Sequence, residues 1–293
     1  MQSVNGSRTY APVFERLWRY DQVVFNASRR SLKYMDQVIT ALPFAVALFA
    51  GMLICLEIGR RVGLRALAKD SQLMSSHSAV DSAVFALYGL LLAFTFSGAP
   101  QRLDTRRQLI AEEANAISTA YLRLDLLSPE SQPAMREKFR EYVDSRLEAY
   151  RKFPDFESAK TELSRSAKLQ TEIWSQAVAD TRLPGCHPEA GKLLLPAVNQ
   201  MIDITTVRTL AVRTHPPAII FALLFLLGLV CSLLAGYGMA VSRRRSWLHI
   251  LAFAAIAVIT VFVILEIEYP RIGFLRVETR FDEILVDLRN NMR

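Results

Sequence analysis

The chain has 293 residues, of which 52% are hydrophobic and 22% charged, and it carries a formal net charge of +7. Three cysteines do not make a disulfide framework, and without a CxxC spacing they do not match a cysteine-based zinc motif. No nucleic-acid-binding motif or aromatic platform accompanies the positive charge, so we predict no nucleic-acid partner.

The apolar residues are gathered in four blocks with almost no charge, at 38–56, 82–99, 217–241 and 247–265. A bilayer core about 30 Å thick is crossed by roughly 20 apolar helical residues. Each block approaches that length, and a water-soluble fold rarely repeats such a run so often. We therefore predict an all-α integral membrane protein with four transmembrane helices, at about 38–58, 82–100, 217–241 and 247–266, in contact with the lipid bilayer.

Residues 1–37 form a basic N-terminal tail ahead of the first span. Apolar side chains such as Phe14 and Trp18 recur at helical spacing beside Arg16 and Arg19. Such an amphipathic helix either rests in the lipid headgroup region with its aromatic rings buried, or packs on the protein's own domain. Both alternatives stay open.

Residues 38–100 are predicted to form a transmembrane hairpin with a face of small residues on each span. The small residues are Ala47, Gly51, Cys55 and Gly59 on the first span, and Ala86, Gly89, Ala93 and Ser97 on the second. Small residues at this spacing let helix backbones approach closely in lipid. The pattern indicates ordinary helix packing.

A second stripe on the second span is polar. Its members, which recur every seven residues on one helix face, are Asp81, Tyr88, Thr95 and Arg102. Because polar side chains are costly in lipid, this face should meet another helix, another subunit or water. It indicates either hydrogen bonding between helices or a pore-lining face, with Phe94 or Phe96 as an apolar constriction that gates by dewetting.

Residues 101–215 are polar and helical in pattern, so we predict a helical-bundle extramembrane domain inserted between the second and third spans. The first helix has a heptad seam at Leu103, Ile110, Ile117 and Leu124. Ser128 is the predicted N-cap of the second helix, with Pro129 in its first turn. Two further helices are expected at about 157–182 and 192–214. Prolines at 100, 216 and 217 allow bends where the chain leaves the membrane.

Charged and polar residues cluster at the start of the first extramembrane helix. The cluster comprises Arg106, Arg107, Glu112, Glu113 and Asn115. Arg107 occupies a position of the heptad seam, so its side chain should be partly buried and paired, because an unpaired buried charge is expensive. We predict a structural ion-pair network at the base of the domain.

Residues 216–268 form a second transmembrane hairpin, and residues 269–293 a polar C-terminal tail. The short loop 59–79 carries four Lys or Arg residues, and loop 242–246 has three arginines. The positive-inside rule then predicts a multi-pass cell (inner) membrane protein with these loops in the cytoplasm and the helical domain outside. Basic residues near 29–33 and 102–107 favour the opposite orientation but lie in long segments, which count less.

The sequence shows no constellation for catalysis. The histidines are scattered, and there is no HExxH, P-loop, GxSxG or GxGxxG motif in a βαβ context. We therefore predict no enzyme activity, no catalytic residue, no metal site and no cofactor.

Three segments carry a family resemblance. The stretch GLLLAFTFSGAPQRLDTRRQLIAEEANAISTAYLRLDLL resembles the signature of the bacterial bestrophin-like domain family, whose members are largely of unknown function. NQMIDITTVRTLAVRTHPP and EIEYPRIGFLRV support it, over roughly 42–277. Pro100 departs from the small residue expected there, which bears on whether the helix continues through it. The resemblance implies the layout of bestrophins: oligomeric anion channels with four spans and a helical domain, cytosolic in that family, between spans two and three.

Two functions remain open at this point. The first is a homo-oligomeric ion channel with a pore lined by the second span and small inorganic ions as its cargo. The second is a non-conducting membrane sensor or scaffold whose helical domain binds a partner. Fold-level likeness alone does not separate them.

Overall fold

The computed structural model describes residues 41–69, 78–152, 156–241, 247–269 and 283–292. These residues are almost entirely helical and include no strand, which confirms the all-α prediction. The chain divides into one unit at Met1–Ala41 and a second at Leu42–Arg293. The amphipathic tail predicted at 1–37 lies outside the described residues.

Among the described residues, four helical segments are long and apolar enough to cross a membrane, as predicted. They contain α2 (Ala41–Lys69), α3 (Ser78–Leu122), α7 (Ala218–Gly238) and α8 (Trp247–Glu268). Helix α2 continues past the predicted span end near residue 58, through the basic segment that was expected to be a loop. An ion pair one turn apart, from Arg61 Nε to Glu57 Oε1 at 2.9 Å, supports the added turns.

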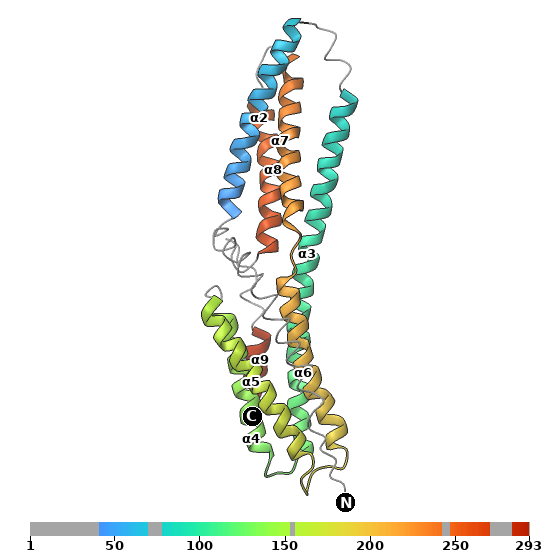
Figure 1. Cartoon of the computed structure of the whole chain (residues 1–293), viewed down its shortest axis with the longest axis vertical. Coiled ribbons are helices and arrows are strands. Elements are labelled where there is room, and N and C mark those ends of the chain that lie inside the picture. The colour runs from blue at the N-terminus through green and yellow to red at the C-terminus, as the bar shows by residue number, and fades with distance from the viewer. Residues whose placement is uncertain (1–40, 70–77, 153–155, 242–246, 270–282, 293) are drawn as a thin grey trace, which may run out of the picture. The chain divides into compact units, whose positions relative to one another are not determined.

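Helix α3 is a single helix of 45 residues that passes through Pro100. It packs on α7 and α8 along the span and on α6 (Ala190–Arg213) beyond it (Figure 1). Proline removes one helical hydrogen bond, but packing on both sides of that position holds the axis. The chain breaks instead at 214–217, between α6 and α7, where Pro216 and Pro217 lie.

The spans share an apolar core that includes Leu48, Met52, Leu224 and Val261. Helices α2 and α7 approach each other closely. A Cβ atom placed on Gly59 would lie 1.9 Å from the carbonyl oxygen of Leu233. Gly59, one of the small residues predicted on this face of α2, is therefore used for backbone contact inside the chain.

A second core lies in the polar half of the chain. It is built by α3, α4 (Gln132–Arg151), α5 (Phe156–Asp180) and α6, with the short 3-10 helix η1 (Arg123–Leu126) after α3. Ile117, Phe139, Tyr142, Ile173 and Met201 are fully buried there. The predicted heptad seam of α3 is buried along its length.

The start of α4 differs from the prediction. The helix begins at Gln132 after Ser131, not at Ser128. Ser128 instead closes the preceding turn: its carbonyl accepts the Ser131 N–H at 2.9 Å, and its hydroxyl donates to that of Ser131 at 3.1 Å. The turn residues were recognised, but the N-cap was placed one turn too early.

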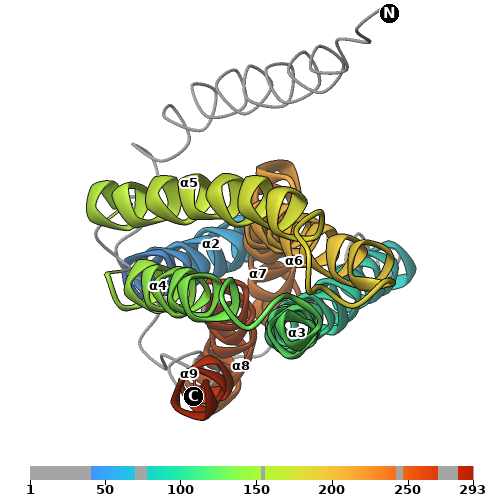
Figure 2. The ribbon, with the colours of Figure 1, turned by 90° about the horizontal axis from the view of Figure 1, so that it is seen from below.

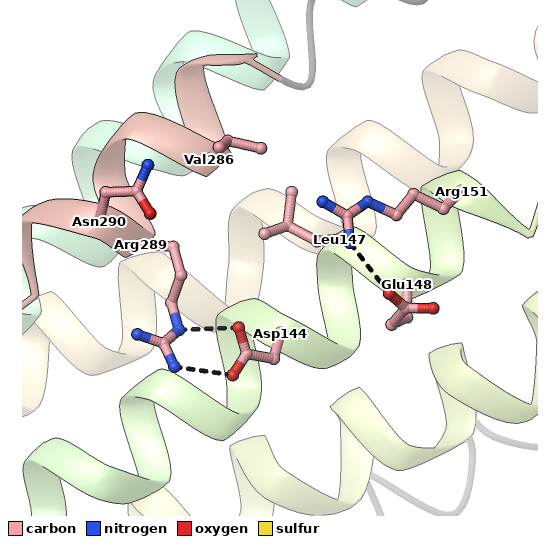
Figure 3. Close-up of a pocket in the computed structure, with 7 residues that line it drawn as sticks. All are labelled: Asp144, Leu147, Glu148, Arg151, Val286, Arg289 and Asn290. Carbon is pink, nitrogen blue, oxygen red and sulfur yellow. Dashed lines mark hydrogen bonds and ion pairs between the residues drawn. The ribbon is translucent and has the colours of Figure 1, made fainter.

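Helix α9 (Glu283–Asn291) lies within the segment predicted as a polar tail. It packs on α3 and α4, and lies next to α4 in Figure 2. Leu285 is fully buried. Arg289 donates from Nε and Nη2 to the two carboxylate oxygens of Asp144 at 2.7 and 2.9 Å (Figure 3). The bidentate pair borders a cavity of about 200 Å³, whose lining is Asp144, Leu147, Glu148, Arg151, Val286, Arg289 and Asn290.

Candidate functional site at the junction of the spans and the helical domain

A charged junction lies where α3 passes the ends of α6 and α8. Arg102 donates to the Glu268 carboxylate from Nε at 2.9 Å and from Nη2 at 2.8 Å. The Glu268 side chain is fully buried, whereas that of Arg102 is 29% exposed. The buried carboxylate is thus held by a cation on the neighbouring helix, which offsets its desolvation.

Arg106 donates to carbonyl groups at the ends of two helices in the same place. Its Nη1 donates to the Glu268 carbonyl at 3.1 Å, its Nη2 to the Thr214 carbonyl at 3.1 Å and its Nε to the Ala211 carbonyl at 3.3 Å. The last carbonyls of a helix lack partners within the helix. One guanidinium therefore satisfies the C-terminal ends of both α6 and α8.

His215 completes the junction from the break between α6 and α7. Its Nδ1 lies 3.0 Å from Glu268 Oε1 and 3.3 Å from Arg106 Nη2, and its ring stacks on Tyr269 at 4.7 Å. A single ring nitrogen donates to the carboxylate when it carries a proton and accepts from the guanidinium when it does not. The junction therefore links α3 to both of the following spans.

A second charged cluster lies deeper in the helical domain. Glu113 is fully buried, accepts from Arg146 Nε at 2.6 Å and also pairs with Arg208. The Tyr150 ring lies beneath the Arg208 guanidinium at 4.0 Å. Burial alone would raise the pKa of Glu113, but Arg146 and Arg208 outweigh it and lower that pKa to about 2. The carboxylate is thus ionised and binds α3 to α4 and α6.

The structure separates the five residues predicted as one ion-pair network. Arg106 belongs to the junction and Glu113 to the deeper cluster. Arg107 and Glu112 interact within α3 with residues about one turn away, at 3.3 and 3.0 Å, and Asn115 is exposed. Sequence reasoning missed Arg146, Arg208 and Glu268, because their partners are 33, 95 and 166 residues away.

The polar stripe of α3 faces helices of the same chain. Tyr88 and Thr95 are only 4% and 7% exposed. The Tyr88 hydroxyl lies against Gly228 of α7, and the Thr95 hydroxyl donates to the Leu91 carbonyl at 2.7 Å. Arg102 pairs with α8 as described. Asp81 is half-buried in the first turn of α3, where the helix dipole favours a carboxylate.

The two phenylalanines predicted beside that stripe lie on exposed parts of α3. Phe94 is 68% exposed and Phe96 44%. The small residues of this span, at positions 86, 89, 93 and 97, are exposed as well. A Cβ atom placed on Gly89 would meet no atom within 4 Å. The outer face of α3 is therefore open in the single chain.

Within the residues that the structure describes, no three His, Cys, Asp or Glu side chains are grouped so that they could hold a metal ion. The site is instead a set of buried charges that fastens long apolar helices to a helical domain. These features define a multi-pass, all-helical membrane protein.

The family follows from comparison of the sequence. The profile of the Bestrophin-like domain matches residues 46–280, so the chain belongs to the bestrophin-like domain family, as its signature segments predicted. No curated protein matches the chain.

Solved structures share the fold at low sequence identity. A mutant of a bacterial bestrophin homolog from Klebsiella pneumoniae has 13% identity and a TM-score of 0.52, over 83% of this chain and 97% of that one. A second crystal structure, described as that of a membrane protein, has 13% identity and a TM-score of 0.57, over 84% and 97% of the two chains. At this identity the likeness concerns the fold.

Proposed function

We propose that the protein is a homo-oligomeric ion channel whose pore is lined by the outer face of α3. The observation that carries the proposal is the unbroken exposure of that face along the span. Val80, Leu87, Leu90 and Phe94 are 65%, 54%, 52% and 68% exposed and recur at intervals of seven, three and four residues. Such a face on a helix that also leaves the membrane suits a symmetry axis shared by several copies.

The polarity of this face changes where α3 leaves the span. Beyond Phe94 the same face carries Ser97, Gln101 and Asp104, all exposed. An apolar stretch followed by a polar one is the arrangement expected of a constriction that opens into a wider aqueous vestibule. The stripe at Tyr88 and Thr95, which faces helices of the same chain, would then leave the pore to the outer face.

Phe94 supplies the first prediction, because it is the most exposed large side chain of the face. Replacing it with alanine (Phe94→Ala) should increase ion flux into proteoliposomes, since a wider and less apolar constriction stays wetted. Leu226 on α7 is also apolar and 58% exposed, so its replacement by alanine is a control that truncates a similar side chain on another helix. Leu226→Ala should leave the flux unchanged. Absence of flux from folded wild-type oligomers would contradict the proposal.

A partner-binding scaffold is the second candidate. It is favoured by apolar side chains exposed on the helical domain: Leu122 at 65%, Leu210 at 66% and Val207 at 49%. Exposed apolar patches on a water-facing domain mark contact surfaces. Measurement of the oligomeric state in mild detergent separates the two functions, because a monomer that carries no flux supports the scaffold.

The orientation in the cell membrane is a further part of the proposal. From the charge of the short loops we expect these loops in the cytoplasm and the helical domain outside. Cys186 is a partly accessible thiol of that domain, whereas Cys55 and Cys231 lie in the spans. An impermeant thiol reagent should therefore label intact cells, and Cys186→Ser should abolish the labelling. Labelling that requires permeabilised cells would place the domain in the cytosol.

A further inference from the structure

A cavity of about 160 Å³ opens at the ends of the spans away from the charged junction. It lies between the C-terminal part of α2, the end of α7 with the following η2 (Met239–Val241), and the start of α8. Its lining residues are Leu53, Leu56, Glu57, Arg60, Gly236, Met239, Trp247 and Ile250. The spans predicted at 38–58, 217–241 and 247–266 begin or end beside this lining, so we expect the cavity to lie near the lipid headgroups.

The chemistry of the lining is that of an amphiphile site. Leu53, Leu56, Met239 and Ile250 form an apolar wall. Trp247 is 53% exposed at its edge, in the position that tryptophan prefers at a membrane interface. An acyl chain in contact with such a wall gains burial, whereas a small polar solute does not.

The charges at the rim favour an anion. Glu57 accepts from Arg61 Nε at 2.9 Å, so its negative charge is offset by an arginine that does not line the cavity. Within the described residues, Arg60 makes no hydrogen bond or ion pair, although its side chain is only partly exposed. A guanidinium with free donors beside an apolar wall matches a phosphate group joined to a hydrocarbon chain.

We propose that this cavity binds an anionic phospholipid of the surrounding leaflet, with the phosphate on Arg60 and part of an acyl chain along α2, α7 and α8. The site is independent of ion conduction. Gly236 and Leu56, at which α7 and α2 are in close backbone contact, both line the cavity, so the bound lipid lies beside that contact.

Quenching of tryptophan fluorescence by brominated lipid tests the proposal. Trp18→Phe and Trp174→Phe leave Trp247 as the reporter in the full chain, reconstituted in phosphatidylcholine vesicles. Brominated phosphatidylglycerol should bind near Trp247 about fivefold more strongly than brominated phosphatidylcholine, the ratio expected for one arginine at a lipid phosphate. Arg60→Gln should bring that ratio close to one.

Arg65→Gln is the matched control, because Arg65 is exposed on the same helix and does not line the cavity. Arg65→Gln should keep the roughly fivefold preference for phosphatidylglycerol over phosphatidylcholine. If both variants lose the preference for phosphatidylglycerol equally, the lipid is attracted to a charged surface in general, and the proposed site is wrong. Displacement of the brominated lipid by inorganic phosphate alone would also overturn it, because the site would then take free phosphate.

Lipid retained by the unmodified protein gives a second measurement that needs no tryptophan replacement. Mass spectrometry after detergent purification should find less phosphatidylglycerol per chain in Arg60→Gln than in the wild type or Arg65→Gln. Equal amounts in all three proteins would contradict the proposal.

Discussion

Replacing Glu113 with glutamine is expected to destabilise the helical domain by about 3–5 kcal/mol, the cost of breaking a buried ion pair. Glu113 is fully buried between Arg146 and Arg208, whose side chains are 5% and 4% exposed. A neutral amide would leave two buried guanidiniums without a counter-charge. For a chain of this size the thermal unfolding midpoint should fall by roughly 10 °C, measured by circular dichroism of the full protein in detergent.

The neighbouring Glu112 provides the control for this prediction. Glu112 is exposed and accepts from Gln108 at 3.0 Å within the same helix. Glu112→Gln makes the same chemical change one position away and should shift the midpoint by no more than about 1 °C, because exposed pairs contribute little. If the midpoint falls no further in Glu113→Gln than in Glu112→Gln, the predicted contribution of the buried cluster to stability is wrong.

The pKa of Glu113 also predicts how the stability of the fold depends on pH. The pKa of Glu113 is lowered from 4.5 to about 2 in the folded chain, since the two arginines outweigh the effect of burial. A lowered pKa stabilises the fold above about pH 4.5, and this contribution is lost as the pH falls towards 2. It amounts to about 3 kcal/mol. In Glu113→Gln the stability at neutral pH should be lower and its decline through this pH window shallower.

Replacing Gly236 with alanine is expected to separate α2 from α7. The added Cβ would lie 2.0 Å from the Leu56 carbonyl oxygen and 2.8 Å from its carbonyl carbon. These are backbone atoms, which cannot rotate away as a side chain would, so the helices must move apart. We expect a loss of at least about 3 kcal/mol, above the usual range for an added methyl group. Thermal midpoint and monodispersity in detergent measure it.

Gly59→Ala should behave in the same way, because its Cβ would lie 1.9 Å from the Leu233 carbonyl oxygen. Gly238→Ala is the matched control on α7: a Cβ there meets no atom within 4 Å. The control should change stability by about 1 kcal/mol at most, the difference in helix propensity between the two residues. A stable Gly236→Ala protein would show that α2 and α7 are not in backbone contact.

The sequence pattern was sufficient to predict the features that depend on one helix alone. The spans follow from runs of apolar residues, and the buried seam of α3 follows from apolar residues at 103, 110, 117 and 124. Both depend on side chains spaced along one local geometry. The sequence did not predict helix α9, because nine residues with four apolar positions carry too weak a period. Its contacts include the ion pair of Arg289 with Asp144 of α4, 145 residues away in the chain.

The amino-acid sequence by itself determined that this is an all-helical membrane protein of the bestrophin-like domain family, because length, polarity and signature residues are properties of local segments. Only the tertiary structure decided which face of α3 stays open and which charges are paired. Tyr88 and Phe94 lie on the same apolar span, yet one is 4% and the other 68% exposed. Glu268 meets Arg102 across 166 residues of chain. Helix period places residues on faces, but the neighbours of each face are set by packing between distant segments.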